Sequence, residues 1–128
     1  MLVVDDDKMS VLLNKRMVIK SGLSSEPLSF NNGKEAFDYL GEHIQEDHSY
    51  LVFLDINMPI MNGWQFLDSI QTMTIANNIL VVMVTSSIEK VDQDKARTYP
   101  QVVDYIEKPY PLTVFNRIKD LPRVASLL

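Results

Sequence analysis

The stretch LDINMPIMNG, residues 54–63, shows an apolar run that ends on a single carboxylate. Residues 51–54 are all apolar and precede Asp55, and Pro59 and Gly63 then follow at short spacing, which predicts a loop. Aspartate alone often begins a turn or caps a helix, so an isolated Asp55 has an ordinary structural explanation. Whether Asp55 also has a chemical role depends on the residues that follow the other predicted strands.

The composition is that of a single globular domain, which we expect to span residues 1–128. The chain is 46% hydrophobic and 23% charged, and its 128 residues suffice for one buried core. It has no cysteine, which excludes disulfides, thiolate chemistry and cysteine zinc sites. The net charge of −5, without a basic block, argues against direct nucleic-acid binding. No apolar run is long enough for membrane insertion and no signal-peptide pattern is visible, so we expect a cytoplasmic protein.

Strand and helix patterns alternate along the whole chain. Residues 79–84 form a β-branched apolar run, typical of a strand buried on both faces. Apolar residues at near-helical spacing predict the first helix: Met9, Leu12, Leu13, Met17 and Ile19. The predicted strands are 1–4, 28–30, 51–54, 79–84 and 102–106, and the predicted helices are 8–20, 34–46, 64–73, 88–98 and 111–120.

Five strand–helix units predict an α/β fold with a doubly wound, five-stranded parallel sheet of order 2-1-3-4-5. This is the flavodoxin-like, three-layer α/β/α sandwich, in which ligands bind at the carboxyl ends of the strands. Strands one and three are then neighbours, about 4.8 Å apart. We therefore expect Asp5 and Asp6, which follow strand one, to lie close to Asp55. Thr85 and Lys108 follow strands four and five at the same edge of the sheet.

Three crowded carboxylates predict a metal site. They repel one another, and a hard divalent cation such as Mg²⁺, which prefers oxygen ligands, relieves the repulsion. Lys108 adds a fixed cation and Thr85 a hydroxyl. The cluster thus indicates a site in which one carboxylate oxygen attacks a phosphoryl group, while Mg²⁺, Lys108 and Thr85 surround the phosphoryl oxygens.

Four short motifs occur in order along the chain: Val4-Asp5-Asp6, Asp55-x-x-Met58-Pro59-x-x-x-Gly63, Thr85-Ser86 and Lys108-Pro109. Together they resemble the receiver domain of two-component response regulators over essentially the whole chain. The chain is most similar to the single-domain regulators of the chemotaxis type, although a receiver domain cut from a larger protein would look the same.

The resemblance implies roles for individual residues in accepting a phosphoryl group. Asp55 would be the phosphoacceptor. Asp5 and Asp6 would hold Mg²⁺ together with Asp55, Asp6 most directly, and Asn57 would add its backbone carbonyl. Lys108 would pair with the phosphoryl oxygens, and its peptide bond to Pro109 is usually cis in the family.

The resemblance also implies a switch and its partners. Thr85 would be the switch hydroxyl and Tyr105 the aromatic that turns inward on activation. A sensor histidine kinase or a phosphotransfer protein would be the donor. The face formed by helix 88–98, strand 102–106 and helix 111–120 would then change its affinity for an unidentified downstream protein. Such a protein is not a turnover enzyme, since it accepts and loses only its own phosphoryl group.

Two alternatives remain at this stage. A metal-dependent phosphatase of the haloacid dehalogenase type uses an Asp-x-Asp motif after its first strand, and Asp5-x-Asp7 fits that spacing, although the chain is short and lacks the family's cap. A phosphorylation-independent interaction module of the same fold is the other, and the complete acid–Thr–Lys set argues against it. Asp7 could tune metal affinity or face water, and His43 and His48 are interpreted as surface residues.

Overall fold

The computed structural model describes residues 1–43, 49–73, 76–86, 89–108 and 110–126. Its sheet has five parallel strands in the order β2-β1-β3-β4-β5, which confirms the predicted topology. The strands are β1 Leu2–Val4, β2 Leu28–Phe30, β3 Tyr50–Leu54, β4 Ile79–Thr85 and β5 Val102–Glu107.

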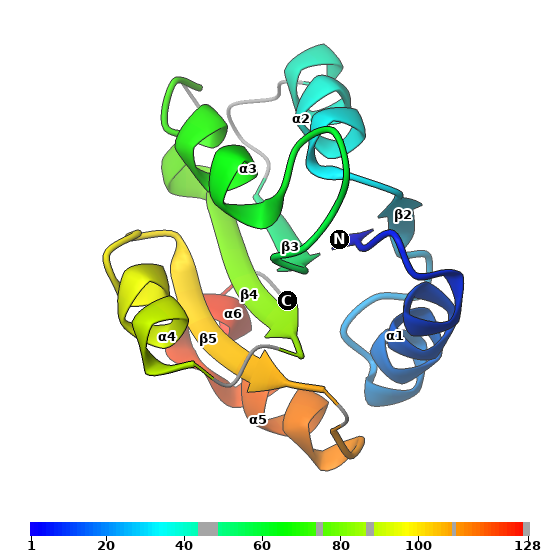
Figure 1. Ribbon diagram of the computed structural model, residues 1–128. Coiled ribbons are helices and arrows are strands. Elements are labelled where there is room, and N and C mark those ends of the chain that lie inside the picture. The colour runs from blue at the N-terminus through cyan, green and yellow to red at the C-terminus, as the bar shows by residue number, and fades with distance from the viewer. Residues whose placement is uncertain (44–48, 74–75, 87–88, 109, 127–128) are drawn as a thin grey trace.

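Helices cover both faces of this sheet, as the three-layer prediction requires (Figure 1). Residues of α2, α3 and α4 pack on one face, and residues of α1, α5 and α6 pack on the other. The helices are α1 Lys8–Ser21, α2 Gly33–Glu42, α3 Gly63–Ile70, α4 Lys90–Arg97, α5 Thr113–Asp120 and α6 Pro122–Ala125, with a short 3₁₀ helix η1 at Ala76–Asn78. Within the described residues, none of these helices has the length and apolarity to cross a bilayer.

Several predicted helix boundaries were too generous. The predicted helix 64–73 ends at Ile70, because the amides of Thr72 and Met73 bond carbonyls only three residues back. The predicted helix 34–46 ends at Glu42, and its residues 44–46 lie outside the described part of the chain, as do residue 88 of the fourth predicted helix and the Pro109 of the predicted cis bond. After the last predicted helix, residues Pro122–Ala125 form α6, which buries Val124.

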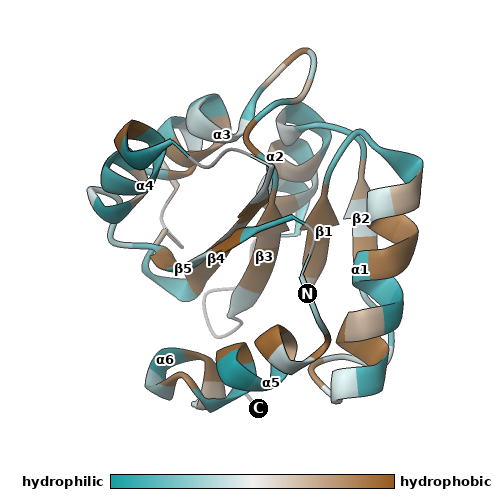
Figure 2. Ribbon diagram, turned by 60° about the horizontal axis from the view of Figure 1, so that its bottom comes forward, coloured by the Kyte–Doolittle hydropathy of each residue, from teal (hydrophilic) through white to brown (hydrophobic). Residues whose placement is uncertain are grey.

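The core lies on both faces of the central strands, and all seven residues of β4 are buried. On the α1–α5 face, the rings of Phe53 and Phe115 lie 5.2 Å apart. Figure 2 shows β1, β3 and β4 as a hydrophobic layer between the helices. Hydrophobic residues on both sides of a strand are expected when helices cover both faces of a parallel sheet.

The buried face of α1 differs from the one that its apolar residues suggest. The helix itself is confirmed, capped by Asp7 at its start and by Gly22 in a left-handed conformation (φ 82°) at its end. However, Asn14 and Val18 are its buried residues. Four of the residues that predict the helix are 45–62% exposed: Met9, Leu12, Leu13 and Ile19.

Candidate functional site

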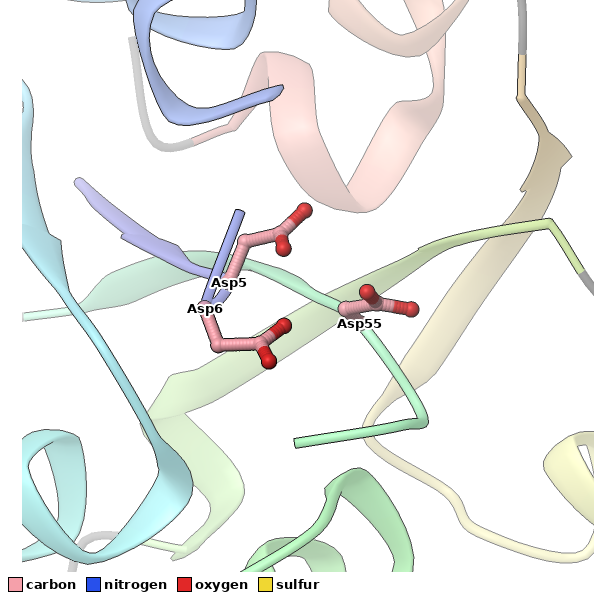
Figure 3. Close-up of side chains that lie close together, drawn as sticks. All are labelled: Asp5, Asp6 and Asp55. Carbon is pink, nitrogen blue, oxygen red and sulfur yellow. The ribbon is translucent and has the colours of Figure 1, made fainter. Parts of the chain in front are cut away.

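Two neighbouring strands bring the acidic residues together. Val4 at the end of β1 pairs with Leu54 at the end of β3, so Asp5 and Asp55 follow adjacent strand ends. The amide of Asp55 donates to the Val4 carbonyl at 3.0 Å, which continues the ladder into the site. Carboxylate oxygens of Asp5, Asp6 and Asp55 all lie within 4.8 Å of one another, and Figure 3 shows the three side chains converging. The predicted crowding is confirmed.

The three acids differ in burial. Asp5 is 2% exposed and Asp55 9%, whereas Asp6 faces solvent. Burial raises the pKa of the Asp55 carboxyl, and the Asp5 charge acts in the same direction. The Lys108 charge and hydrogen bonds from Thr85 and the Ile56 amide act to lower this pKa without reversing the shift. A charged Asp55 is therefore costly in this site, and a bound cation would offset that cost.

Lys108 reaches the same cluster from β5. Its amide donates to the Thr85 carbonyl at 2.8 Å, which holds the ends of β4 and β5 together. Its Nζ lies 2.6 Å from Asp5 Oδ2, 3.4 Å from Asp55 Oδ2 and 3.3 Å from Ser10 Oγ. Burial acts to lower the pKa of Lys108, but the hydrogen bond to Asp5 and the two carboxylate charges outweigh it, so the net shift is upward. Lys108 is thus held charged inside the site.

The two predicted switch residues, Thr85 and Tyr105, lie on the neighbouring strands β4 and β5. Thr85, fully buried at the end of β4, makes a side-chain hydrogen bond to Asp55. Tyr105 pairs in register with Met83, two residues before Thr85, and packs half-buried against the core. It also lines a groove of about 300 Å³ between α4 and β5.

Backbone contacts hold the end of the loop after Asp55 close to its beginning. Gly63 donates its amide to the Ile56 carbonyl at 2.8 Å, and a Cβ on Gly63 would lie 2.5 Å from the Asp55 carbonyl oxygen. Only glycine fits this approach. Asn62 and Gln65 then form a capping box that starts α3. Asn57 lies in this loop with its side chain exposed, and its predicted carbonyl ligand stays a prediction.

The chemistry of the cluster fits a hard divalent cation. It offers carboxylate oxygens from three residues at mutual distances that one ion can bridge, and the exposed Asp6 leaves one side open to water. Mg²⁺ prefers one or two carboxylates together with waters, which matches an open acidic set of this kind.

The contact between Ser10 and Lys108 was not predicted from the sequence, which also left open whether Asp7 tunes metal affinity or faces water. Asp7 caps α1: its carboxylate accepts the Met9 amide at 3.0 Å and the Ser10 hydroxyl at 3.2 Å. Ser10 in turn contacts Lys108. An aspartate directly before an apolar run at helical spacing indicates such a cap, but no sequence pattern places Lys108 beside it. His43 is exposed, as predicted, and His48 lies outside the described residues.

Comparison with protein families gives one match across most of the chain. A family model described as the response regulator receiver domain matches residues 1–118. The chain is 31% identical over 116 residues to the transcriptional regulatory protein MalR of Bacillus subtilis, covering 90% of this chain and 46% of MalR. It therefore spans about half the length of that relative.

Solved structures show the same fold. A two-component response regulator from Cytophaga hutchinsonii superposes with a TM-score of 0.84 at 27% identity, covering 98% of this chain and 95% of that one. The receiver domain of a sensor histidine kinase from Pseudomonas aeruginosa, with a magnesium ion coordinated in its active-site cleft, gives a TM-score of 0.74 at 16% identity. That match covers 91% of this chain and 90% of the other.

Proposed function

This chain belongs to the response regulator receiver domain family, and we propose that it is a signalling switch phosphorylated on Asp55. The observation that carries the assignment is the arrangement around Asp55. Among the three converging acids, Asp55 is nearly buried, touches Lys108 and is hydrogen-bonded to Thr85. The proposed receiver unit is the whole chain, residues 1–128.

The contacts of the two buried acids favour Asp55 over Asp5 as the nucleophile. Asp5 has both oxygens held at short distance, one by the Asp7 amide at 2.9 Å and one by Lys108 at 2.6 Å. Asp55 uses Oδ1 to accept the Ile56 amide at 2.7 Å, while its Oδ2 meets Lys108 only at 3.4 Å. Lys108 thus lies farther from Asp55 than from Asp5, which supports attack by Asp55.

In the proposed reaction, a carboxylate oxygen of Asp55 attacks the phosphorus of a phosphohistidine. The new O–P bond forms as the P–N bond breaks, and the leaving histidine nitrogen takes up a proton from solvent. Lys108 donates hydrogen bonds to the phosphoryl oxygens as negative charge gathers on them. Water later cleaves the acyl phosphate, which restores the carboxylate and releases inorganic phosphate. The chain therefore modifies only itself and is not a turnover enzyme on an external substrate.

The proposed cofactor is Mg²⁺, held by Asp5, Asp6 and Asp55 with the Asn57 carbonyl. When bound, it would neutralise the carboxylate charges and those of the incoming phosphoryl oxygens. The magnesium ion named for the Pseudomonas aeruginosa receiver domain is in keeping with this choice. The acidic set of the present chain, rather than that distant relative, carries the argument.

The proposed output is a change on the face formed by α4, β5 and α5. The phosphoryl group draws the Thr85 hydroxyl toward its oxygens, and Tyr105 moves into the space that Thr85 leaves. The groove that Tyr105 lines between α4 and β5 changes shape as a result. This is a two-state equilibrium biased by a local charge.

We propose a sensor histidine kinase or a phosphotransfer protein as the donor and a protein as the downstream partner. The net charge of −5 gives no basis for direct contact with nucleic acid. The cytoplasmic location stays a prediction.

Intact-mass measurement after incubation with acetyl phosphate and Mg²⁺ tests the proposal. The wild-type chain should gain one phosphoryl group, and Asp55→Asn should gain none while keeping its circular dichroism spectrum. Asp38→Asn, which alters an exposed acid paired with Lys34 on α2, serves as the matched control and should label normally. Full labelling of Asp55→Asn would refute the acceptor assignment. A wild-type chain that folds yet stays unlabelled would favour the interaction module.

A further inference from the structure

We infer that Ser10 is a positioning residue for Lys108: it offers the ammonium an uncharged acceptor, so that Lys108 can leave Asp5 when a divalent cation binds there. The inference rests on the proposed function only for the reason why Lys108 should move from Asp5 to Ser10. The contacts that support it join Asp5, Asp7, Ser10 and Lys108.

The hydrogen-bond direction between Ser10 and Lys108 is fixed by chemistry. A lysine ammonium has three N–H donors and no acceptor, so the Ser10 hydroxyl must accept from Lys108 across the 3.3 Å contact. The Ser10 hydroxyl in turn donates a hydrogen bond to Asp7 Oδ2, which lies 3.2 Å away. Asp7 thus turns a lone pair of Ser10 toward Lys108.

The position of this hydroxyl is also fixed by the start of α1. Asp7 is the N-cap, and its Oδ1 accepts the Met9 amide at 3.0 Å. The Asp7 amide donates to Asp5 Oδ1 at 2.9 Å, which connects the cap to the acidic cluster itself. Ser10 therefore lies on an ordered first turn whose placement relative to the site is set by three hydrogen bonds: Asp7 N–H to Asp5, Met9 N–H to Asp7 and Ser10 O–H to Asp7.

Asp5 faces competing demands. It holds Lys108 at 2.6 Å and is one of the three residues whose oxygens could hold a cation. An ammonium and a divalent cation on the same carboxylate repel each other. Among the described residues, three acceptors surround Lys108: Asp5 and Asp55 belong to the acidic cluster, and Ser10 does not. Without Ser10, a cation would compete with Lys108 for every one of these acceptors.

Loss of the Ser10 hydroxyl should therefore weaken cation binding rather than strengthen it. Ser10→Ala is expected to weaken Mg²⁺ affinity on the order of 3- to 10-fold, the scale of one hydrogen bond to a charged group that water partly replaces. Partial replacement is expected because the Lys108 side chain is 20% exposed. Ser10→Thr, which keeps the hydroxyl, should restore most of the affinity.

The measurement is a Mg²⁺ titration of the full chain, followed by amide NMR shifts of residues 5–10 and 54–57. Ser21→Ala, at the other end of α1 where the hydroxyl donates to the Val18 carbonyl, is the matched control and should titrate like wild type. Equal Mg²⁺ affinity in wild type and Ser10→Ala would overturn the inference. Failure of Ser10→Thr to recover affinity would also overturn it.

A double-mutant cycle separates positioning from a general structural effect. If Ser10 acts through Lys108, Ser10→Ala should leave Mg²⁺ affinity unchanged in a Lys108→Met background. The same loss in both backgrounds would show that Ser10 acts on the acids or on the helix start instead, and the inference would fail. The Mg²⁺ titration measures binding, so it decides the role of Ser10 even if acetyl phosphate labels none of the proteins. Failure of the wild-type chain to be labelled would count against the proposed function and not against the role of Ser10.

Discussion

Helices α3 and α4 pack on the same face of the sheet but are anchored in different ways. Each has eight residues, yet α3 buries Gly63, Phe66, Leu67 and Ile70, whereas α4 buries only Ala96. A capping box also stabilises the start of α3, whereas the N-cap residue of α4 makes no side-chain hydrogen bond to the helix. Figure 2 shows α4 as mostly hydrophilic. Apolar packing therefore contributes little to holding α4 in position.

Side-chain contacts at and just after the C-terminal end of α4 partly replace the core packing that this helix lacks. Lys95 lies 4.6 Å from the centre of a Trp64 ring, and Tyr99 stacks near the same indole at 6.2 Å. The Tyr99 hydroxyl donates to Asp68 at 2.6 Å. Further along the chain, the amides of Gln71 and Gln101 exchange hydrogen bonds at 2.8 and 3.2 Å. We call these six residues the α3–α4 seam: Trp64, Asp68, Gln71, Lys95, Tyr99 and Gln101.

The seam joins one face of α3 to the end of α4 and the start of β5. Trp64, Asp68 and Gln71 are spaced four and three residues apart, so they share that face. The pairs hold α4 at one end, whereas α3 is held along its length by core packing. An element with few buried apolar contacts opens at low free-energy cost, and α4 borders the groove that Tyr105 lines. This face of the sheet therefore combines a helix anchored along its length with one anchored mainly at its C-terminal end.

The largest effect should come from the core of α3. Phe66→Ala should lower the free energy of unfolding by about 3–5 kcal/mol, because it removes a fully buried ring and leaves a cavity. The matched change in α4, Val91→Ala, should stay within about 0.5 kcal/mol because Val91 is exposed. Urea unfolding measures both. Similar losses from the two variants would contradict the comparison.

The next effect concerns the proposed switch. Beryllofluoride with Mg²⁺, which mimics the phosphoryl group, should change amide hydrogen exchange in α4 and β5 more than in α3. Thr85→Ala should still be phosphorylated but should lose most of that change, because the short hydroxyl that must move is gone. The corresponding loss of coupling to partner affinity is roughly 5- to 150-fold. An unchanged exchange pattern in wild type on adding the analogue would indicate binding without switching.

Breaking the seam should affect α4 selectively. Tyr99→Phe removes the hydrogen bond to Asp68 and should cost about 0.5–1.5 kcal/mol at most. Hydrogen exchange of residues 90–99 should rise while that of residues 63–70 stays near the wild-type level. Tyr39→Phe on α2, a tyrosine outside the seam, provides the control. Equal acceleration in both helices would mean that the seam does not anchor α4 separately.

The smallest expected effect is a change in the pKa of Tyr99. Burial, the hydrogen bond to Asp68 and the Asp68 charge raise the pKa of Tyr99 to about 12. Because the folded-state pKa exceeds the unfolded value of about 10, the contribution of Tyr99 to stability is present below pH 10 and is lost as the pH rises toward 12. Asp68→Asn should lower the pKa of Tyr99, seen as phenolate absorbance appearing at lower pH. Identical titration curves for the two proteins would sink this assignment.

The candidate site was predictable to a large extent because it is built from strand ends. A parallel sheet places the carboxyl ends of its strands at one edge, so polar residues directly after apolar runs must gather there. Asp5, Asp6 and Asp55 are brought together as predicted, with Lys108 beside Asp5 and Asp55. Their roles as metal ligands, phosphoacceptor and phosphoryl partner stay predictions.

The order of the elements, the sheet topology and the edge at which the acids meet could all be predicted from the amino-acid sequence. These depend on local patterns of two and 3.6 residues and on the geometry common to parallel sheets. Two features became visible only in the folded chain: α1 buries Asn14 rather than Leu12 or Leu13, and Ser10 lies against Lys108, 98 residues away. Helical spacing predicts a helix but not the face it packs against the sheet. That face depends on the packing of all its neighbours at once, and so does any contact that spans the chain.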